Sequence, residues 1–123
     1  NKLIKKNLPI FGICLGHQVL AEYFNATIEN LPVVKHGVTS VIYQRQNCSI
    51  FKDIPDSFRV GHYHSWVVSE NNLPKCLEIT STNEEGIITS FKHKHFNVKG
   101  VQFHPESILT EYGLQIIKNW LIS

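Results

Sequence analysis

The stretch LPIFGICLGHQ, residues 8–18, decides the fold of this chain. Leu8–Ile13 is a short apolar run that predicts a buried strand, and Gly16–Phe24 carries apolar residues at helical spacing. Glycines stand two positions before and two after Cys14, and small residues in these places permit a sharp turn. The stretch therefore predicts a strand, a tight elbow and a helix, with the Cys14 side chain projecting from the carboxyl end of the strand.

A cysteine at such an elbow is a candidate nucleophile. A free thiol has a pKa of about 8.5, and the positive end of the following helix is expected to lower the pKa of Cys14. The backbone N–H of Leu15 is placed to donate to an oxyanion. The alternative is that Cys14 is a small buried apolar side chain, the commonest role of a free cysteine. The elbow alone leaves both roles open.

A second motif, VQFHPES at residues 101–107, follows another short apolar strand near the end of the chain. A nucleophilic cysteine needs a base, and His104 can take the thiol proton and later return it to a leaving group. Glu106 can hold the imidazole of His104 in one tautomer and stabilise its charged form. The alternatives are a histidine hydrogen-bonded within a loop and a solvated carboxylate before a helix, and ninety positions separate Cys14 from His104.

The middle of the chain predicts short strands, most of them antiparallel, because β-branched and aromatic residues recur in brief runs. These runs are Thr39–Tyr43, Trp66–Val68, Leu77–Thr80, Ile87–Phe91 and Val98–Phe103. Residues 83–86, NEEG, have the composition of a hairpin turn, with Gly86 available for positive φ. A closing amphipathic helix is predicted over Glu111–Leu121, with Leu114, Ile117 and Leu121 on its apolar face and Trp120 beside them.

This order of elements predicts an α/β fold with an antiparallel insertion and enough apolar material for one domain. An α/β sheet opened by one strand is implausible, and the chain of 123 residues has no methionine and begins Asn1-Lys2-Leu3. Residues 1–123 are therefore expected to be the C-terminal portion of a single domain, truncated at the N-terminus.

Composition narrows the function classes. A net charge of +2 with scattered basic residues disfavours nucleic acid, and no apolar stretch approaches the roughly 20 residues that cross a bilayer. Three widely spaced cysteines indicate neither a disulfide framework nor a zinc site, so no metal and no cofactor is expected. A cytoplasmic protein with reduced thiols is the expectation.

Residues 9–18, PIFGICLGHQ, together with residues 101–107, strongly resemble the class I, or triad-type, glutamine amidotransferases. The resemblance continues through residues 36–40, HGVTS, and residues 63–66, YHSW, so that it covers nearly the whole chain. It implies a class I amidotransferase-like fold, a flavodoxin-like sheet with an antiparallel insertion. It also implies that Cys14, His104 and Glu106 form a catalytic triad.

The resemblance further implies that Gln18, with the backbone of Ser65 and Trp66, holds the substrate glutamine. A surface glutamine and a core aromatic residue are the alternatives for Gln18 and Trp66. The ending HPESILT, residues 104–110, is similar to the subunits that supply ammonia to chorismate-using synthases. Anthranilate synthase component II is the first expectation and its aminodeoxychorismate synthase counterpart the second. A γ-glutamyl hydrolase and an inactive partner-binding fragment are the other readings.

Overall fold

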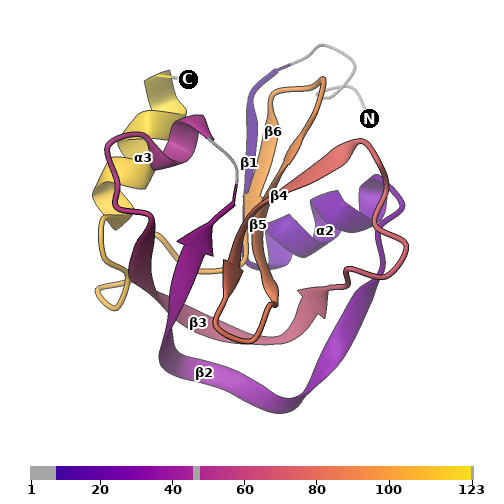
Figure 1. Cartoon of the computed structure of the whole chain (residues 1–123), viewed down its shortest axis with the longest axis horizontal. Helices are drawn as coiled ribbons and strands as arrows, with labels where there is room; N and C mark the ends of the chain where they lie inside the picture. Colours follow the sequence, from indigo (N-terminus) through magenta and orange to yellow (C-terminus); the bar gives the residue numbers. More distant parts are fainter. Residues whose placement is uncertain (1–7, 46–47, 123) are drawn as a thin grey trace.

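The structure is a computed structural model that describes residues 8–45 and 48–122, with the backbone alone for residues 32–37, 64 and 65. Figure 1 shows strands in the middle of the molecule with a helix on either side. The elements in chain order are β1 (Ile10–Ile13), α2 (Leu15–Tyr23), β2 (Ile28–Gln44), the 3₁₀ helix η1 (Ser49–Phe51), β3 (Ser57–Val68), β4 (Leu77–Asn83), β5 (Ile88–His93), β6 (Val98–Val101) and α3 (Gly113–Ile122).

The strands of the described residues form one six-stranded sheet in the order β1-β6-β5-β4-β2-β3. β1 and β6 are parallel, with Ile10 opposite Val98 and Ile13 opposite Val101. Each other neighbouring pair of strands is antiparallel. The predicted α/β fold with an antiparallel insertion is therefore confirmed, and the parallel pair brings the ends of two distant motifs together.

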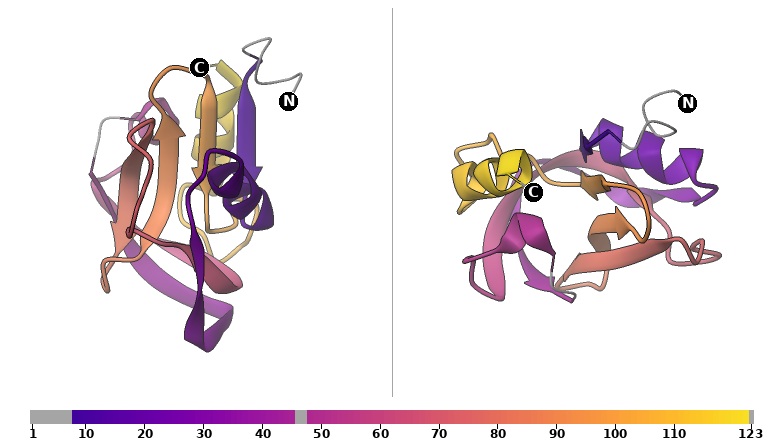
Figure 2. Two further views of the ribbon diagram at one scale, coloured as in Figure 1. Left: turned by 90° about the vertical axis from the view of Figure 1, so that its right-hand side faces the viewer. Right: turned by 90° about the horizontal axis from the view of Figure 1, so that it is seen from above.

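The helices α2 and α3 cover opposite sides of the β1–β6 pair (Figure 2). Beneath α2, the buried residues Ala21, Val68 and Phe91 belong to one apolar cluster. The other cluster lies between the sheet, η1 and α3, where Phe11 and Trp120 stack with ring centroids 5.5 Å apart. Burial of apolar surface on both sides fixes the parallel pair from two directions.

The hairpin predicted at residues 83–86 is confirmed. Gly86 has φ +79° and donates its N–H to the Asn83 carbonyl at 3.0 Å, while the Asn83 side chain accepts the N–H groups of Glu85 and Ile87. Positive φ costs a glycine little, and an asparagine side chain readily mimics a backbone acceptor. The turn residues thus close β4 onto β5.

The predicted last helix is present, and its predicted apolar face is correct for Trp120, which packs against the core, but wrong for the two leucines. Leu114 and Leu121 are 67% and 68% exposed, whereas α3 buries Gly113, Ile116 and Asn119. Asn119 donates its amide N–H groups to the carbonyls of Ile50 and Lys52, both at 2.9 Å. A polar residue thus occupies the centre of the buried face because it binds the backbone around η1, and hydropathy alone gives no signal for such a position.

Candidate active site

Cys14 lies in a strained elbow between β1 and α2. Its backbone has φ 53° and ψ −102°, a conformation that non-glycine residues rarely adopt, and its N–H donates to the Val101 carbonyl of β6 at 2.8 Å. α2 begins at the next residue, and its first N–H groups have no partner within the helix. The elbow predicted from the sequence is therefore present, and the Cys14 side chain leaves the sheet at its carboxyl end.

Gly12 and Gly16 contribute unequally to this elbow. A β-carbon added to Gly12 would lie 2.6 Å from Leu20 Cδ1 and 2.7 Å from the carbonyl carbon and oxygen of Gly16. A β-carbon on Gly16 would meet nothing within 4 Å. The prediction that the turn needs a small residue on each side of Cys14 holds for Gly12 and is wrong for Gly16.

We expect Gly12→Ala to destabilise the protein by about 1–3 kcal/mol, the usual cost of overpacking, because backbone lies in the way of the new methyl group. Gly16→Ala is the matched control, and it should be neutral or stabilising by up to about 1 kcal/mol, since alanine favours a helix over glycine. Urea unfolding measures both free energies. Equal values for the two variants would contradict this account of the elbow.

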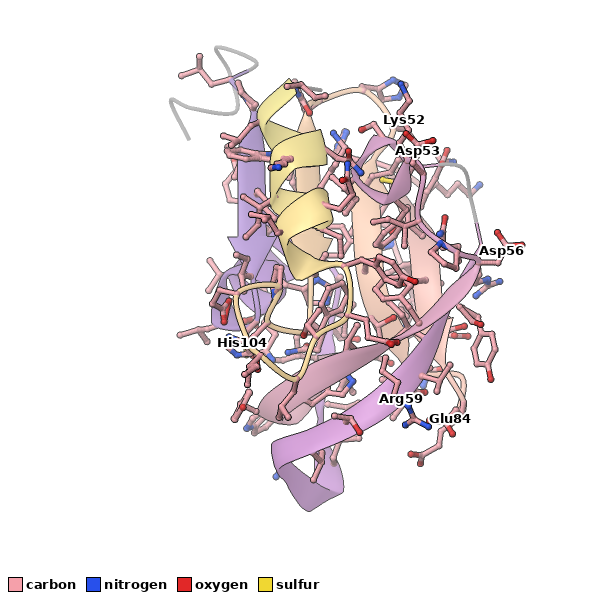
Figure 3. The ribbon with its side chains drawn as sticks, turned by 90° about the vertical axis from the view of Figure 1, so that its left-hand side faces the viewer. Lys52, Asp53, Asp56, Arg59, Glu84 and His104 are labelled. Atoms are coloured by element: carbon pink, nitrogen blue, oxygen red, sulfur yellow. The ribbon has the colours of Figure 1, made fainter. Side chains whose placement is uncertain are left out.

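The loop after β6 carries His104 and is bound to β3 along its length. The His104 N–H donates to the Gly61 carbonyl at 3.2 Å, and the Gly61 N–H donates to Thr110 Oγ1 at 2.9 Å. Thr110 Oγ1 in turn donates to the His104 carbonyl at 2.6 Å, and the Glu111 N–H bonds the Arg59 carbonyl at 2.8 Å. These bonds hold the loop rigidly at the end of the sheet to which β1 points, where Figure 3 labels His104.

His104 and Glu106 form a hydrogen-bonded pair, as the sequence predicts. Nδ1 of His104 lies 2.9 Å from Oε2 of Glu106, which leaves Nε2 as the ring nitrogen available to a reacting group. The His104 ring meets the Tyr63 ring edge to face, with centroids 5.2 Å apart. The Cys14 thiol lies 3.9 Å from the Tyr63 carbonyl, so Tyr63 contacts both the candidate nucleophile and the candidate base.

The pKa of the Cys14 thiol is raised, chiefly because partial burial disfavours the thiolate. The Leu15 N–H at the start of α2 and the Gln102 side chain lower this pKa, and the nearby Glu106 carboxylate raises it. The lowering expected from the helix is therefore present but is outweighed by burial. Nucleophilic attack by Cys14 thus requires a base that removes the thiol proton.

The structure brings Gln18 and Trp66 together beneath the elbow. Gln18 is buried, and its Nε2 donates to the Trp66 carbonyl at 2.8 Å and to Gln102 Oε1 at 3.2 Å. The Trp66 side chain is half exposed, and the backbone of Ser65 precedes it in β3. The N–H groups of the Gln18 amide are engaged within the protein, so its Oε1 is the atom of this amide that can accept a hydrogen bond from a ligand.

Gln102 is a site residue that the sequence reasoning missed. Its side chain is fully buried, and its Nε2 donates to the Cys14 sulfur at 3.7 Å. A signal was available, because a glutamine between the buried residues Val101 and Phe103 requires hydrogen-bond partners inside the protein.

A hollow of about 400 Å³ lies away from Cys14, lined by residues that include Gln44, Cys48 and Asp53. Figure 3 labels Lys52, Asp53 and Asp56 of this hollow far from His104. Cys48 is a buried core residue whose pKa is raised by burial. The hollow therefore contributes nothing to the chemistry at the elbow.

Comparison with known proteins agrees with this geometry. The family model described as glutamine amidotransferase class-I matches residues 1–123. A candidate anthranilate synthase component II from Haemophilus influenzae is 45% identical over 112 residues, which are 91% of this chain and 58% of the relative. The aminodeoxychorismate synthase component 2 of Klebsiella aerogenes is 42% identical over 113 residues, 92% of this chain and 60% of the relative.

A crystal structure from Thermoplasma acidophilum, described as a candidate component of GMP synthase, superimposes with a TM-score of 0.87. It shares 29% sequence identity, and the match covers 98% of this chain and 59% of that one. The match to this chain spans 58% of the Haemophilus relative and 60% of the Klebsiella relative, so the chain covers less than two thirds of their length.

The site combines a cysteine at a strand-to-helix elbow, a parallel strand pair and a loop that carries a histidine–glutamate pair, all on an α/β sheet. The match along the whole chain shows which family this is: the protein belongs to the class I glutamine amidotransferases. Among its described residues, no helix is both long and apolar enough to span a membrane.

Proposed function

We propose that this protein is a glutaminase subunit that hydrolyses glutamine through Cys14, His104 and Glu106 and supplies ammonia to a chorismate-using synthase. One observation carries the proposal: Cys14 stands at φ 53° at the carboxyl end of β1, beside the loop that holds His104 against Glu106. Strain of this kind in a residue other than glycine is typical of a functional position. The assignment of residues 1–123 to the C-terminal portion of one amidotransferase domain stays a prediction.

The first step is attack on the side-chain amide of glutamine. His104 takes the Cys14 thiol proton, and the sulfur forms a bond to the amide carbon to give a tetrahedral oxyanion. The Leu15 N–H at the start of α2 donates to this oxyanion. The carbon–nitrogen bond then breaks, and the proton held by His104 passes to the departing ammonia.

The second step hydrolyses the γ-glutamyl thioester that remains on Cys14. Water attacks the thioester carbon while His104 accepts a proton from the water. The carbon–sulfur bond then breaks, glutamate is released, and His104 returns the proton to the Cys14 sulfur. Glu106 stabilises the charged imidazole in both steps through the 2.9 Å contact with Nδ1. Cys14 and His104 therefore return to their starting protonation states at the end of the cycle.

The substrate is proposed to lie between the elbow and β3. Oε1 of Gln18 and the main chain of Ser65 and Trp66 would bind the polar groups of glutamine, and the support for this is their position beneath Cys14. Hydrogen bonds from neutral groups can select an amide without the desolvation cost of added charge.

The proposed partner is a synthase, with anthranilate synthase first and aminodeoxychorismate synthase second. Relatives named as components of each are 45% and 42% identical to this chain. Exposed apolar side chains surround the site: Leu15 follows the nucleophile, Tyr63 flanks the base and Ile108 is fully exposed in the loop after Glu106. Such side chains around a polar site support a protein surface as the partner.

The test is the release of glutamate from glutamine by the chain, with and without each of the two synthases, together with labelling of Cys14 by a glutamine-analogue electrophile. Release that a synthase stimulates, with Cys14 labelled, is the expected result. Release at full rate without any synthase would instead favour a γ-glutamyl hydrolase. Binding of a synthase with neither release nor labelling would favour an inactive partner-binding protein.

A further inference from the structure

A buried chain of side-chain amides leads from β3 to the nucleophile. The Trp66 carbonyl accepts a hydrogen bond from Gln18 Nε2, which lies 3.2 Å from Gln102 Oε1, and Gln102 Nε2 lies 3.7 Å from Cys14 Sγ. Gln18 is 6% exposed and Gln102 is 0% exposed, so both amides depend on these partners in place of water.

The Trp66 carbonyl fixes the direction of these hydrogen bonds. A backbone carbonyl can only accept, so the Gln18 nitrogen must face Trp66. The atom of Gln102 that Gln18 Nε2 approaches must then be its oxygen, which leaves the Gln102 nitrogen facing the sulfur. The chain of amides therefore presents a donor, and not an acceptor, to Cys14.

We propose that Gln102 stabilises the thiolate of Cys14 by donating its Nε2–H to the sulfur, and that Gln18 is a positioning residue that holds the Gln102 amide in this orientation. The inference rests on the proposed function only in taking Cys14 as the reacting group. A donor at this place favours the charged sulfur over the neutral thiol, and hydrogen bonds to charged groups are the stronger ones.

Other groups around the sulfur act on the same equilibrium between thiol and thiolate. The surrounding elements carry several titratable residues, which are His17, Glu22 and Tyr23 of α2, Arg59, His62, Tyr63 and His64 of β3, Lys99 of β6, and His104 and Glu106 of the loop after β6. Burial and the Glu106 carboxylate both disfavour the thiolate, and the Leu15 N–H and Gln102 oppose them. Gln102 is the side chain among these influences that lowers the pKa of Cys14.

Gln102→Met removes the donor while keeping an unbranched side chain of similar length. We expect the midpoint of Cys14 alkylation by iodoacetamide against pH to rise by about one unit, the low end of what one hydrogen bond to a charge supplies. Gln18→Met should move the midpoint in the same direction by less. The midpoint pH is measured in place of the alkylation rate. A thiolate with a higher pKa is also a better nucleophile, and this offsets part of the loss in rate.

Gln44→Met is the matched control, since the Gln44 amide binds only the carbonyls of Ile54 and Pro55 among the described residues. Mass spectrometry of the alkylated peptides follows Cys14 and Cys76 in the same sample, and the midpoint for Cys76 should not move. A Cys14 midpoint in Gln102→Met equal to that of the unsubstituted protein would overturn the proposal.

A second measurement needs no substitution at Gln102. In the ¹⁵N-labelled protein, the side-chain amide resonances of Gln102 should titrate with the midpoint of Cys14, and this titration should vanish in Cys14→Ala. Resonances that stay constant through the Cys14 midpoint would overturn the proposal even if Gln102→Met fails to fold. Neither measurement uses glutamine turnover, so an inactive protein would refute the proposed function and leave this inference standing.

Discussion

Cys14→Ala should abolish glutamine-dependent product formation by this protein and its synthase, while synthesis from added ammonia by the same synthase continues. The substitution removes the atom that forms the thioester, and loss of a covalent nucleophile costs roughly three or more powers of ten in rate. The methyl group of alanine keeps the β-carbon in the elbow, so the fold is expected to remain. Measurement of product with glutamine and with ammonium salts, at equal protein concentrations, separates the two activities.

Cys76→Ala is the control for this experiment, because Cys76 is a half-buried free thiol that packs against the cluster beneath α2. It should keep its glutamine-dependent activity. Glutamine use retained by Cys14→Ala would refute the assignment of the nucleophile, and the ammonia-dependent activity measured in the same sample verifies that the synthase itself is working.

Gly113→Ala is expected to destabilise the protein more than alanine at the other glycines whose surroundings the structure describes. A β-carbon on Gly113 would lie 1.9 Å from the carbonyl oxygen of Pro105, much closer than van der Waals contact allows. This oxygen belongs to the backbone and cannot move aside as the end of a flexible side chain can. The loop from His104 to Tyr112 is tied to β3 by several hydrogen bonds and cannot withdraw freely. We expect a loss of about 3 kcal/mol, the upper end for overpacking.

Gly113→Ala should also separate His104 from Glu106, because Pro105 joins these two residues. Leu114→Ala is the matched control: Leu114 is the next residue of α3 and is 67% exposed, so truncation should change the free energy of unfolding by no more than about 0.5 kcal/mol. Urea unfolding compares the two variants. Equal stability would mean that the loop gives way easily and that α3 does not support the His104 loop.

The local elements of this fold are predictable from sequence where one residue type has one physical reason to be there. The elbow follows from Gly12 and an apolar strand, and the β4–β5 turn follows from Asn83 and Gly86. The pairing of His104 with Glu106 follows from their spacing of two residues around a proline. Each of these predictions depends on short-range geometry.

The parts that the sequence did not reveal depend on contacts between distant segments. β2 extends over Ile28–Gln44 although only Thr39–Tyr43 is predicted, because its first part is held by pairing with β3. α3 buries Asn119 in place of Leu114 because backbone acceptors around η1 lie opposite it. Gln102 binds Cys14, 88 positions away, and no local pattern specifies such a contact.

The pairing of β1 with β6 also has a kinetic consequence. The two strands come from opposite ends of the described chain, so closing this parallel pair carries the entropy cost of a very long loop and raises the contact order of the protein. Contacts of this range form late, after the hairpins between them. The Cys14 elbow and the His104 loop therefore come together only when folding is nearly complete, and in partly folded chains the Cys14 thiol lies outside the environment of the native site.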